Sequence, residues 1–244
     1  MRCIPKINGV YWLSLAVASL FGANAGGFLV SVVGLDDLRG LPFLAAALAL
    51  VFFAERVVKQ ASTLFFWAAV VLIRASATSV SDVIHDSHIR LMSVPVLCLL
   101  LAVMVIVWRA RQPATEEQGF IPVNVVYWIT LFVAGVLGTV GSDAASYPLG
   151  FGFLGAMVAF ALPLGFLLTI GRYGLYTDLG FYWLVVVLIV AAGTAAGDLL
   201  MQVLHSIDLG AAISGAAFVA LIVVMYEVRK GNRRLDVETV GEGA

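Results

Sequence analysis

The sequence predicts an all-α polytopic membrane protein with eight transmembrane helices. Of its 244 residues, 62% are hydrophobic and only 12% are charged, whereas soluble domains carry roughly 25% charged residues. The apolar residues form long runs, each long enough to cross a bilayer. A sequence motif that contains an aromatic–tryptophan pair occurs four times. This recurrence divides the chain into repeated units.

The repeated units align on four aromatic pairs: Tyr11-Trp12, Phe66-Trp67, Tyr127-Trp128 and Tyr182-Trp183. Fifteen residues after each tryptophan stand Gly27, Asp82, Asp143 and Asp198, and four residues before these stand Ala23, Thr78, Thr139 and Thr194. The positions beside them hold only small residues, which include Gly22, Gly26, Gly138, Gly193 and Gly197. Small residues at this spacing allow helices to pack closely, so we expect these glycines at helix–helix contacts.

Each unit has room for two helices of about 20 residues. Taken in order, we expect helices near 9–33, 41–58, 63–84, 91–109, 123–147, 150–171, 180–204 and 209–228. Segments that break helices separate them, such as "GLDDLRGLP", "HDSHIR", "GRYGLYTDLG" and "HSIDLG". The units then span about 9–58, 63–109, 123–171 and 180–228, in a single membrane domain over 1–244.

The segment "RQPATEEQG" predicts a linker at 110–122 between two halves, 8–114 and 124–230, and residues 229–244 remain as a cytoplasmic tail. Each unit has an even number of spans, so all four point the same way. We therefore expect parallel repeats that are pseudo-symmetric about an axis along the membrane normal.

Lysine and arginine predict the orientation, because they favour the cytoplasmic side. Only Arg39 and Arg90 fall on one face of the predicted bundle. The other face holds eleven basic residues: Arg2, Lys6, Arg56, Lys59, Arg109, Arg111, Arg172, Arg229, Lys230, Arg233 and Arg234. Both termini are thus predicted to be cytoplasmic, and the tryptophans would mark the cytoplasmic interface.

A resemblance to a known family rests on two segments, "FYWLVVVLIVAAGTAAGD" and "VYWITLFVAGVLGTVGSD". The chain resembles a bacterial family of uncharacterised membrane proteins that consist of four tandem two-helix repeats, a domain of unknown function. The resemblance covers nearly the whole chain and implies a bacterial cytoplasmic (inner) membrane protein, but it implies no reaction. The first unit departs from the pattern, since Ala23 and Gly27 replace the threonine and the aspartate.

The repeated Thr/Asp phrase is the candidate binding site. Residues four apart share one face of a helix, so Thr78 lies beside Asp82, and the pairs Thr139/Asp143 and Thr194/Asp198 follow the same rule. Several carboxylates at one depth can share protons, bind a cation through oxygen ligands, or face water. The alternative is that each aspartate bonds a neighbouring helix and only stabilises the bundle.

Two further side chains are assigned to this site. Arg74 lies seven residues after Trp67, in mid-membrane, where its counterparts are Ser19, Gly135 and Val190. It is expected to face the bundle interior as a gate or counter-charge below the acids, or else to pair with carbonyls in a packed core. Asn24 is the only polar side chain that the first unit offers.

The second unit also offers a candidate metal site. His85, Asp86 and His88 lie close together after Asp82, and imidazole with carboxylate suits manganese, iron or zinc. The alternative, which we favour, is a hydrated helix end with ordinary polar residues.

Function follows only in outline. No motif for an enzyme or for nucleotide binding is present, so we expect no catalysis, no cofactor and no nucleic-acid partner. The partners expected are the lipid bilayer and a small cation or protons, while the oligomeric state stays open. The leading hypothesis is gradient-driven transport of a cation, with divalent metals among the candidates. The alternatives are a passive cation channel and a membrane scaffold with structural aspartates.

Overall fold

The chain folds entirely into helices over the residues that the computed structural model describes, 7–31, 37–58, 62–86, 90–110, 123–171 and 179–241. The helices are α1 (Gly9–Ser31), α2 (Asp37–Val58), α3 (Ser62–Asp86), α4 (Arg90–Ala110), α5 (Val125–Ser146), α6 (Gly152–Gly171), α7 (Leu179–Leu204) and α8 (Ile207–Gly241). Each contains 19 to 25 residues that are apolar enough to cross a membrane. The predicted fold class is therefore confirmed, and the protein is an integral, multi-pass membrane protein.

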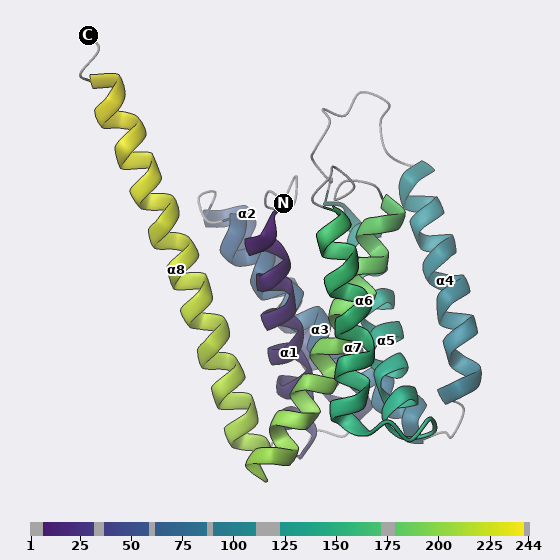
Figure 1. The fold of residues 1–244 in the computed structure, drawn as a ribbon. Coiled ribbons are helices and arrows are strands. Elements are labelled where there is room, and N and C mark those ends of the chain that lie inside the picture. The colour runs from purple at the N-terminus through teal and green to yellow at the C-terminus, as the bar shows by residue number, and fades with distance from the viewer. Residues whose placement is uncertain are drawn as a thin grey trace.

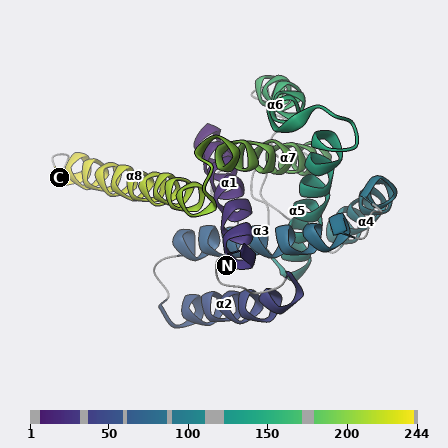
Figure 2. The same cartoon turned by 90° about the horizontal axis from the view of Figure 1, so that it is seen from below.

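The four odd-numbered helices form a closed ring around a central axis. Within this ring α1 packs on α3, α3 on α5, α5 on α7, and α7 on α1 (Figure 2). Asn8 and Asn124 accept hydrogen bonds from the backbone N–H groups of Tyr11 and Tyr127 and so cap the starts of α1 and α5. The aromatic pairs of these two units consequently stand in the first turns of their helices.

Each even-numbered helix packs mainly on the first helix of the next unit rather than on that of its own unit. Helix α2 covers α3, α4 covers α5, α6 covers α7, and α8 returns to cover α1 (Figures 1 and 2). The even helices remain largely exposed, with only 6% to 17% of each span buried, against 44% to 67% for the odd helices. The even helices therefore form the lipid-facing layer, and the odd helices form the core.

The C-terminal helix is longer than the sequence predicts. Its membrane-spanning part ends at Glu227, near the predicted end of the span, but the helix continues to Gly241 through the predicted tail. Figure 1 shows this extension beyond the bundle, on the side where α1 begins. The predicted linker lies almost wholly outside the described residues.

Candidate functional site

Three layers of side chains cross the central axis. The aromatic and carboxylate layers each follow one register of the repeat, and the third layer is Arg74 with the hydroxyls that it reaches. We call them the aromatic layer (Tyr11, Phe66, Tyr127 and Tyr182), the arginine layer (Arg74, Ser19, Thr139 and Thr194) and the carboxylate layer (Asp82, Asp143 and Asp198). Eight residues rise about 12 Å along a helix. The aromatic and carboxylate layers therefore lie near opposite ends of the odd helices, and Arg74 starts midway between them.

The carboxylate layer places Asp198 within electrostatic range of the other two predicted acids. The Asp198 carboxyl interacts electrostatically with those of Asp143 and Asp82. Asp143 is 8% exposed and accepts a hydrogen bond of 3.3 Å from the Ser81 hydroxyl. Asp82 and Asp198 are partly exposed. The layer thus combines one buried carboxyl with two that reach the surface.

His85 extends the carboxylate layer toward the surface. Its Nδ1 lies 3.9 Å from the Asp143 Oδ2, and 30% of its side chain is exposed. The imidazole also packs edge-on against Tyr147, with the ring centroids 5.3 Å apart. At this separation a protonated imidazole forms an ion pair with the carboxylate, at a distance longer than a direct hydrogen bond.

The fourth corner of the carboxylate layer is Gly27, where α1 has no acid. A Cβ atom at this position would meet no heavy atom within 4 Å. The first unit therefore leaves open space at the register that holds an aspartate in the other three units.

The arginine layer is buried and neutral apart from the guanidinium itself. Arg74 is 0% exposed and donates from Nε to the Ser19 hydroxyl at 3.1 Å, and from Nη1 and Nη2 to the hydroxyls of Thr139 and Thr194 at 3.2 Å each. Nη1 also lies 3.4 Å from the Gly135 carbonyl oxygen. No carboxylate of the described residues pairs with the guanidinium. The expectation that Arg74 faces the bundle interior is met, with hydroxyls and a carbonyl as partners.

The structure brings only two of the three predicted threonines together. The hydroxyls of Thr139 and Thr194 lie 3.4 Å apart, on either side of the guanidinium. Thr78 instead donates to the backbone carbonyl of Arg74 one turn earlier and packs against α1 at Gly26. Thr139 and Thr194 thus bind the arginine, one turn below the acids that follow them in sequence.

Asn24 lies away from these layers. Its side-chain amide donates to the Gly210 carbonyl and to the Ser214 hydroxyl of α8, both at 3.2 Å. Asn24 is fully buried at the interface where the last helix meets the first. The structure therefore places it in the contact that closes the ring of units.

The five small-residue positions lie where helices approach most closely. A Cβ atom on Gly22 or Gly26 would meet α3, one on Gly138 would meet α7, and one on Gly193 or Gly197 would meet α1. These contacts cover three of the four interfaces in the ring, and Gly135 makes the corresponding contact between α5 and α3.

The metal hypothesis falls mostly on residues that are not described. His88 lies outside the described ranges, as does the Asp86 side chain. Among the side chains that are described, no group of three His, Cys, Asp or Glu residues is placed to hold a metal ion.

The aromatic layer closes the opposite end of the axis. The rings of Tyr11 and Phe66 lie 6.5 Å apart, those of Phe66 and Tyr127 6.4 Å, and those of Tyr11 and Tyr182 6.4 Å. The Tyr182 hydroxyl lies 2.6 Å from that of Tyr11 and 3.0 Å from that of Tyr127. Four residues after each member of the aromatic layer, one turn further along the helix, stands a buried aliphatic side chain: Leu15, Val70, Leu131 and Val186.

The aromatic layer adds residues that sequence reasoning missed. Trp12, Trp67 and Trp183, which were expected to mark the depth of the membrane interface, are each at most 2% exposed. Each lies inside the bundle because the aromatic residue of the neighbouring unit packs on it, with centroids 5.6 Å apart. The signal was present in the sequence, since Tyr, Phe, Tyr and Tyr precede the four tryptophans.

The chemistry of the axis differs at its two ends. Carboxylates within electrostatic range repel one another unless a proton or a cation neutralises them. The arginine layer presents a fixed positive charge to any cation that moves beyond them, and the aliphatic and aromatic layers exclude water from the far end. The described axis therefore carries carboxylates at one end and buried apolar side chains at the other, with the Arg74 guanidinium between them.

Comparisons with known proteins locate one resemblance. Residues 181–229 match the family model described as Repeat of Unknown Function (DUF347). No curated protein and no solved structure matches the chain. The matched segment contains most of α7 and the spanning part of α8, which is the fourth unit of the repeat. In this unit the chain is similar to an uncharacterised repeat-containing family, as its aromatic–tryptophan and Thr/Asp phrases predict.

Proposed function

We propose that the protein is a gradient-driven cation transporter that binds its cation, and the protons exchanged for it, at the carboxylate layer. The observation that carries this proposal is the order of charges along one axis. Three acids, with Asp198 in electrostatic range of the other two, lie at a partly exposed end, and a fully buried arginine lies beneath them. Because charge in the membrane interior is costly, such charges mark ion pathways more often than they stabilise a bundle.

The buried arginine favours a transporter over a passive channel. A channel needs a continuous polar path, whereas this axis is filled by a guanidinium, four aliphatic side chains and a ring of aromatic residues. A cation at the carboxylate layer can therefore return only to the side from which it came. Passage to the other side requires the odd helices to move, which is alternating access rather than permeation.

The carboxylate layer favours protons as the coupling ion. Asp143 is nearly buried, and His85 offers it a partly exposed imidazole at 3.9 Å, which gives a proton a route to the surface. Binding of a cation would displace protons from these groups, because both neutralise the same charges. We further propose that the chain lies in a bacterial inner membrane with its termini in the cytoplasm, so that the acids open outward, and that it catalyses no reaction.

The test is cation flux in proteoliposomes, with and without a pH gradient, for sodium, potassium, manganese, zinc and iron. The wild type is compared with Asp143→Asn/Asp198→Asn. The matched control is Asp208→Asn, which removes an exposed acid from the start of α8. We expect saturable flux that the pH gradient drives, that the control retains, and that the double variant loses while its thermal unfolding stays near that of the wild type.

Two other outcomes would overturn the proposal. Flux that follows voltage without saturating would identify a channel. Absence of flux for every cation, together with a large loss of stability in the double variant, would identify structural aspartates and a scaffold.

A further inference from the structure

A regular offset relates neighbouring odd helices in the ring. A Cβ atom on Gly138 of α5 would meet Val190 of α7, and one on Gly193 of α7 would meet Ser19 of α1. In both contacts the tenth residue after the tryptophan of one unit meets the seventh residue after the tryptophan of the next unit. Residues four apart share a helix face. The fourteenth and eighteenth positions of one helix therefore face the eleventh and fifteenth positions of the next, and the fifteenth is the register of the acids.

The contact of α3 with α5 shows what these two positions do. Ser81 and His85 are the fourteenth and eighteenth residues after Trp67, and both reach the Asp143 carboxyl of the following unit. The Ser81 hydroxyl donates to Oδ2 at 3.3 Å, and the His85 Nδ1 lies 3.9 Å from the same atom. Two side chains of α3 therefore contact the acid of α5.

The same two positions of α5 carry serines. Ser142 and Ser146 follow Trp128 by fourteen and eighteen residues, so the offset directs them toward Thr194 and Asp198 of α7. Ser142 is 0% exposed and Ser146 7%, and within the described part of the chain neither hydroxyl has a hydrogen-bond partner. A buried hydroxyl without a partner costs free energy. In a folded protein such a group is commonly explained by a water molecule or an ion that it binds.

We propose that Ser142, Ser146 and Asp198 form the binding site of a monovalent alkali cation. This inference rests on the proposed function, because it names the class of cation that the carboxylate layer binds. The two hydroxyls and the carboxylate supply only oxygen ligands, which hard cations prefer. Hydroxyl ligands are neutral, so the single carboxylate balances one positive charge.

The charges around this site favour a monovalent ion over a divalent metal. The Arg74 guanidinium donates to Thr194, one turn below Asp198, and its Coulomb repulsion is twice as large for a divalent as for a monovalent cation. Asp82 and Asp143 act on Asp198 electrostatically. The three acids do not share a metal ion, however, since no group of three His, Cys, Asp or Glu among the described side chains is placed to hold one.

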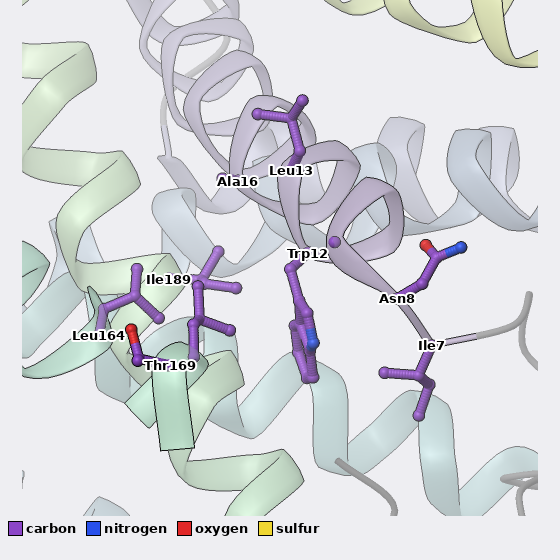
Figure 3. Close-up of a pocket in the computed structure, with 10 residues that line it drawn as sticks. Ile7, Asn8, Trp12, Leu13, Ala16, Leu164, Thr169 and Ile189 are labelled. Atoms are coloured by element: carbon purple, nitrogen blue, oxygen red, sulfur yellow. The ribbon is translucent and has the colours of Figure 1, made fainter. Parts of the chain in front are cut away.

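A groove at the opposite end of the bundle lacks the groups that a cation needs. It has a volume of about 730 Å³, and Figure 3 shows the Trp12 indole between Leu164 and Ile189 on one side and Ile7 and Asn8 on the other. None of the residues that line it is charged, so it offers a cation no ligand of opposite charge. The acid and the two serines supply what this groove lacks.

The experiment measures thermal unfolding of the purified protein in detergent. Sodium chloride, potassium chloride and manganese chloride are each compared with choline chloride at equal ionic strength. We expect at least one alkali cation to raise the melting temperature of the wild type, because a ligand stabilises the folded state that binds it. In Ser142→Ala/Ser146→Ala the same rise should need at least about tenfold more cation, since two ligands are lost.

The matched control is Ser79→Ala, which removes a buried hydroxyl that bonds the Ala75 carbonyl of its own helix. It should keep the wild-type response. In choline chloride the Ser142→Ala/Ser146→Ala protein should be as stable as the wild type or more stable, because the two hydroxyls have no partner in the described fold. If the double variant does not fold, Ser146→Ala alone, which removes the hydroxyl that faces Asp198, replaces it in the comparison.

Two results would overturn the proposal: an unchanged response to alkali cations in the folded serine variant, or a wild type that responds to manganese and to neither alkali cation. Flux in proteoliposomes separates this failure from failure of the proposed function. Manganese flux without alkali binding would refute the alkali site and leave the transporter standing. Alkali binding without flux of any cation would support the site and refute transport.

Discussion

Among single residues, Arg74 has the largest influence on what the axis can do. Its guanidinium is fully buried and is held by hydroxyls and a carbonyl from α1, α5 and α7. Neutral partners offset only part of the cost of burying a charge, which is several kcal/mol. The other three units pack with Ser19, Gly135 and Val190 at this register, so packing alone does not require an arginine. A role of the charge in ion movement is part of the function proposed above.

Arg74→Met tests this role. Methionine fills similar space and removes the cost of burying the charge, while the hydroxyls of Ser19, Thr139 and Thr194 lose a donor. We expect unchanged or higher thermal stability in detergent, together with loss of coupled flux in proteoliposomes. Arg109→Met, at an exposed position near the end of α4, should change neither measurement. A strongly destabilised Arg74→Met protein whose folded fraction still transports would show that the arginine is structural.

At the scale of helices, small residues determine how closely the ring packs. Each of the four interfaces in the ring contains a glycine at a close contact. Lipid provides no hydrophobic force between helices, so close van der Waals packing holds them together. The same tight interfaces that form the ring bring the arginine and the acids to one axis.

Gly138 and Gly141 of α5 allow a matched comparison. A Cβ atom on Gly138 would overlap the Val190 side chain and lie 3.0 Å from the Val187 carbonyl, whereas one on Gly141 would meet nothing within 4 Å. We expect Gly138→Ala to lower the free energy of unfolding by about 1–3 kcal/mol through overpacking. Gly141→Ala should raise it by up to about 1 kcal/mol, because alanine favours helix more than glycine does. Thermal unfolding of both variants in one detergent measures the difference, and equal shifts would refute the close contact at Gly138.

For the whole molecule, the decisive feature is that the last helix closes the ring of units. Helix α8 covers α1, as each other even helix covers the first helix of the following unit. This contact includes the Asn24 bonds to Gly210 and Ser214 and the stacked rings of Phe21 and Phe218 at 5.7 Å. Without α8, the buried amide of Asn24 would lose both partners, which costs about 1–3 kcal/mol by itself.

Two truncations test this closure. A chain that ends after residue 206 lacks α8, and we expect a large fall in melting temperature with loss of the monodisperse species in size-exclusion chromatography. A chain that ends after residue 228 keeps the spanning part of α8 and should behave like the full chain. Similar behaviour of the two truncated chains would mean that the contact between α8 and α1 contributes little to stability.

Much of the architecture could be predicted because it depends on local patterns. Apolar runs of about 20 residues predicted the eight helices, and the repeat predicted four parallel units arranged about one axis. The register also identified Asp82, Asp143 and Asp198 as a group and Arg74 as an interior residue. The roles of these residues stay predictions.

Other features were decided by tertiary contacts. Asn24 and Arg74 were both predicted to face a common site, yet Asn24 bonds α8 while Arg74 reaches Thr139 and Thr194 across the axis. The neighbouring unit also buries Trp12, Trp67 and Trp183 inside the bundle.

The sequence by itself determined the number of helices, the repeat and the register at which charges occur, because periodicity and hydrophobic length are properties of a short stretch of chain. Only the tertiary structure decided that each even helix covers the next unit, that α8 closes on α1, and that three side-chain layers cross one axis. These features depend on the direction in which side chains point and on contacts between segments far apart in the chain. Many helix arrangements would bury the same apolar residues. Shape complementarity and hydrogen bonding between distant segments decide which arrangement forms.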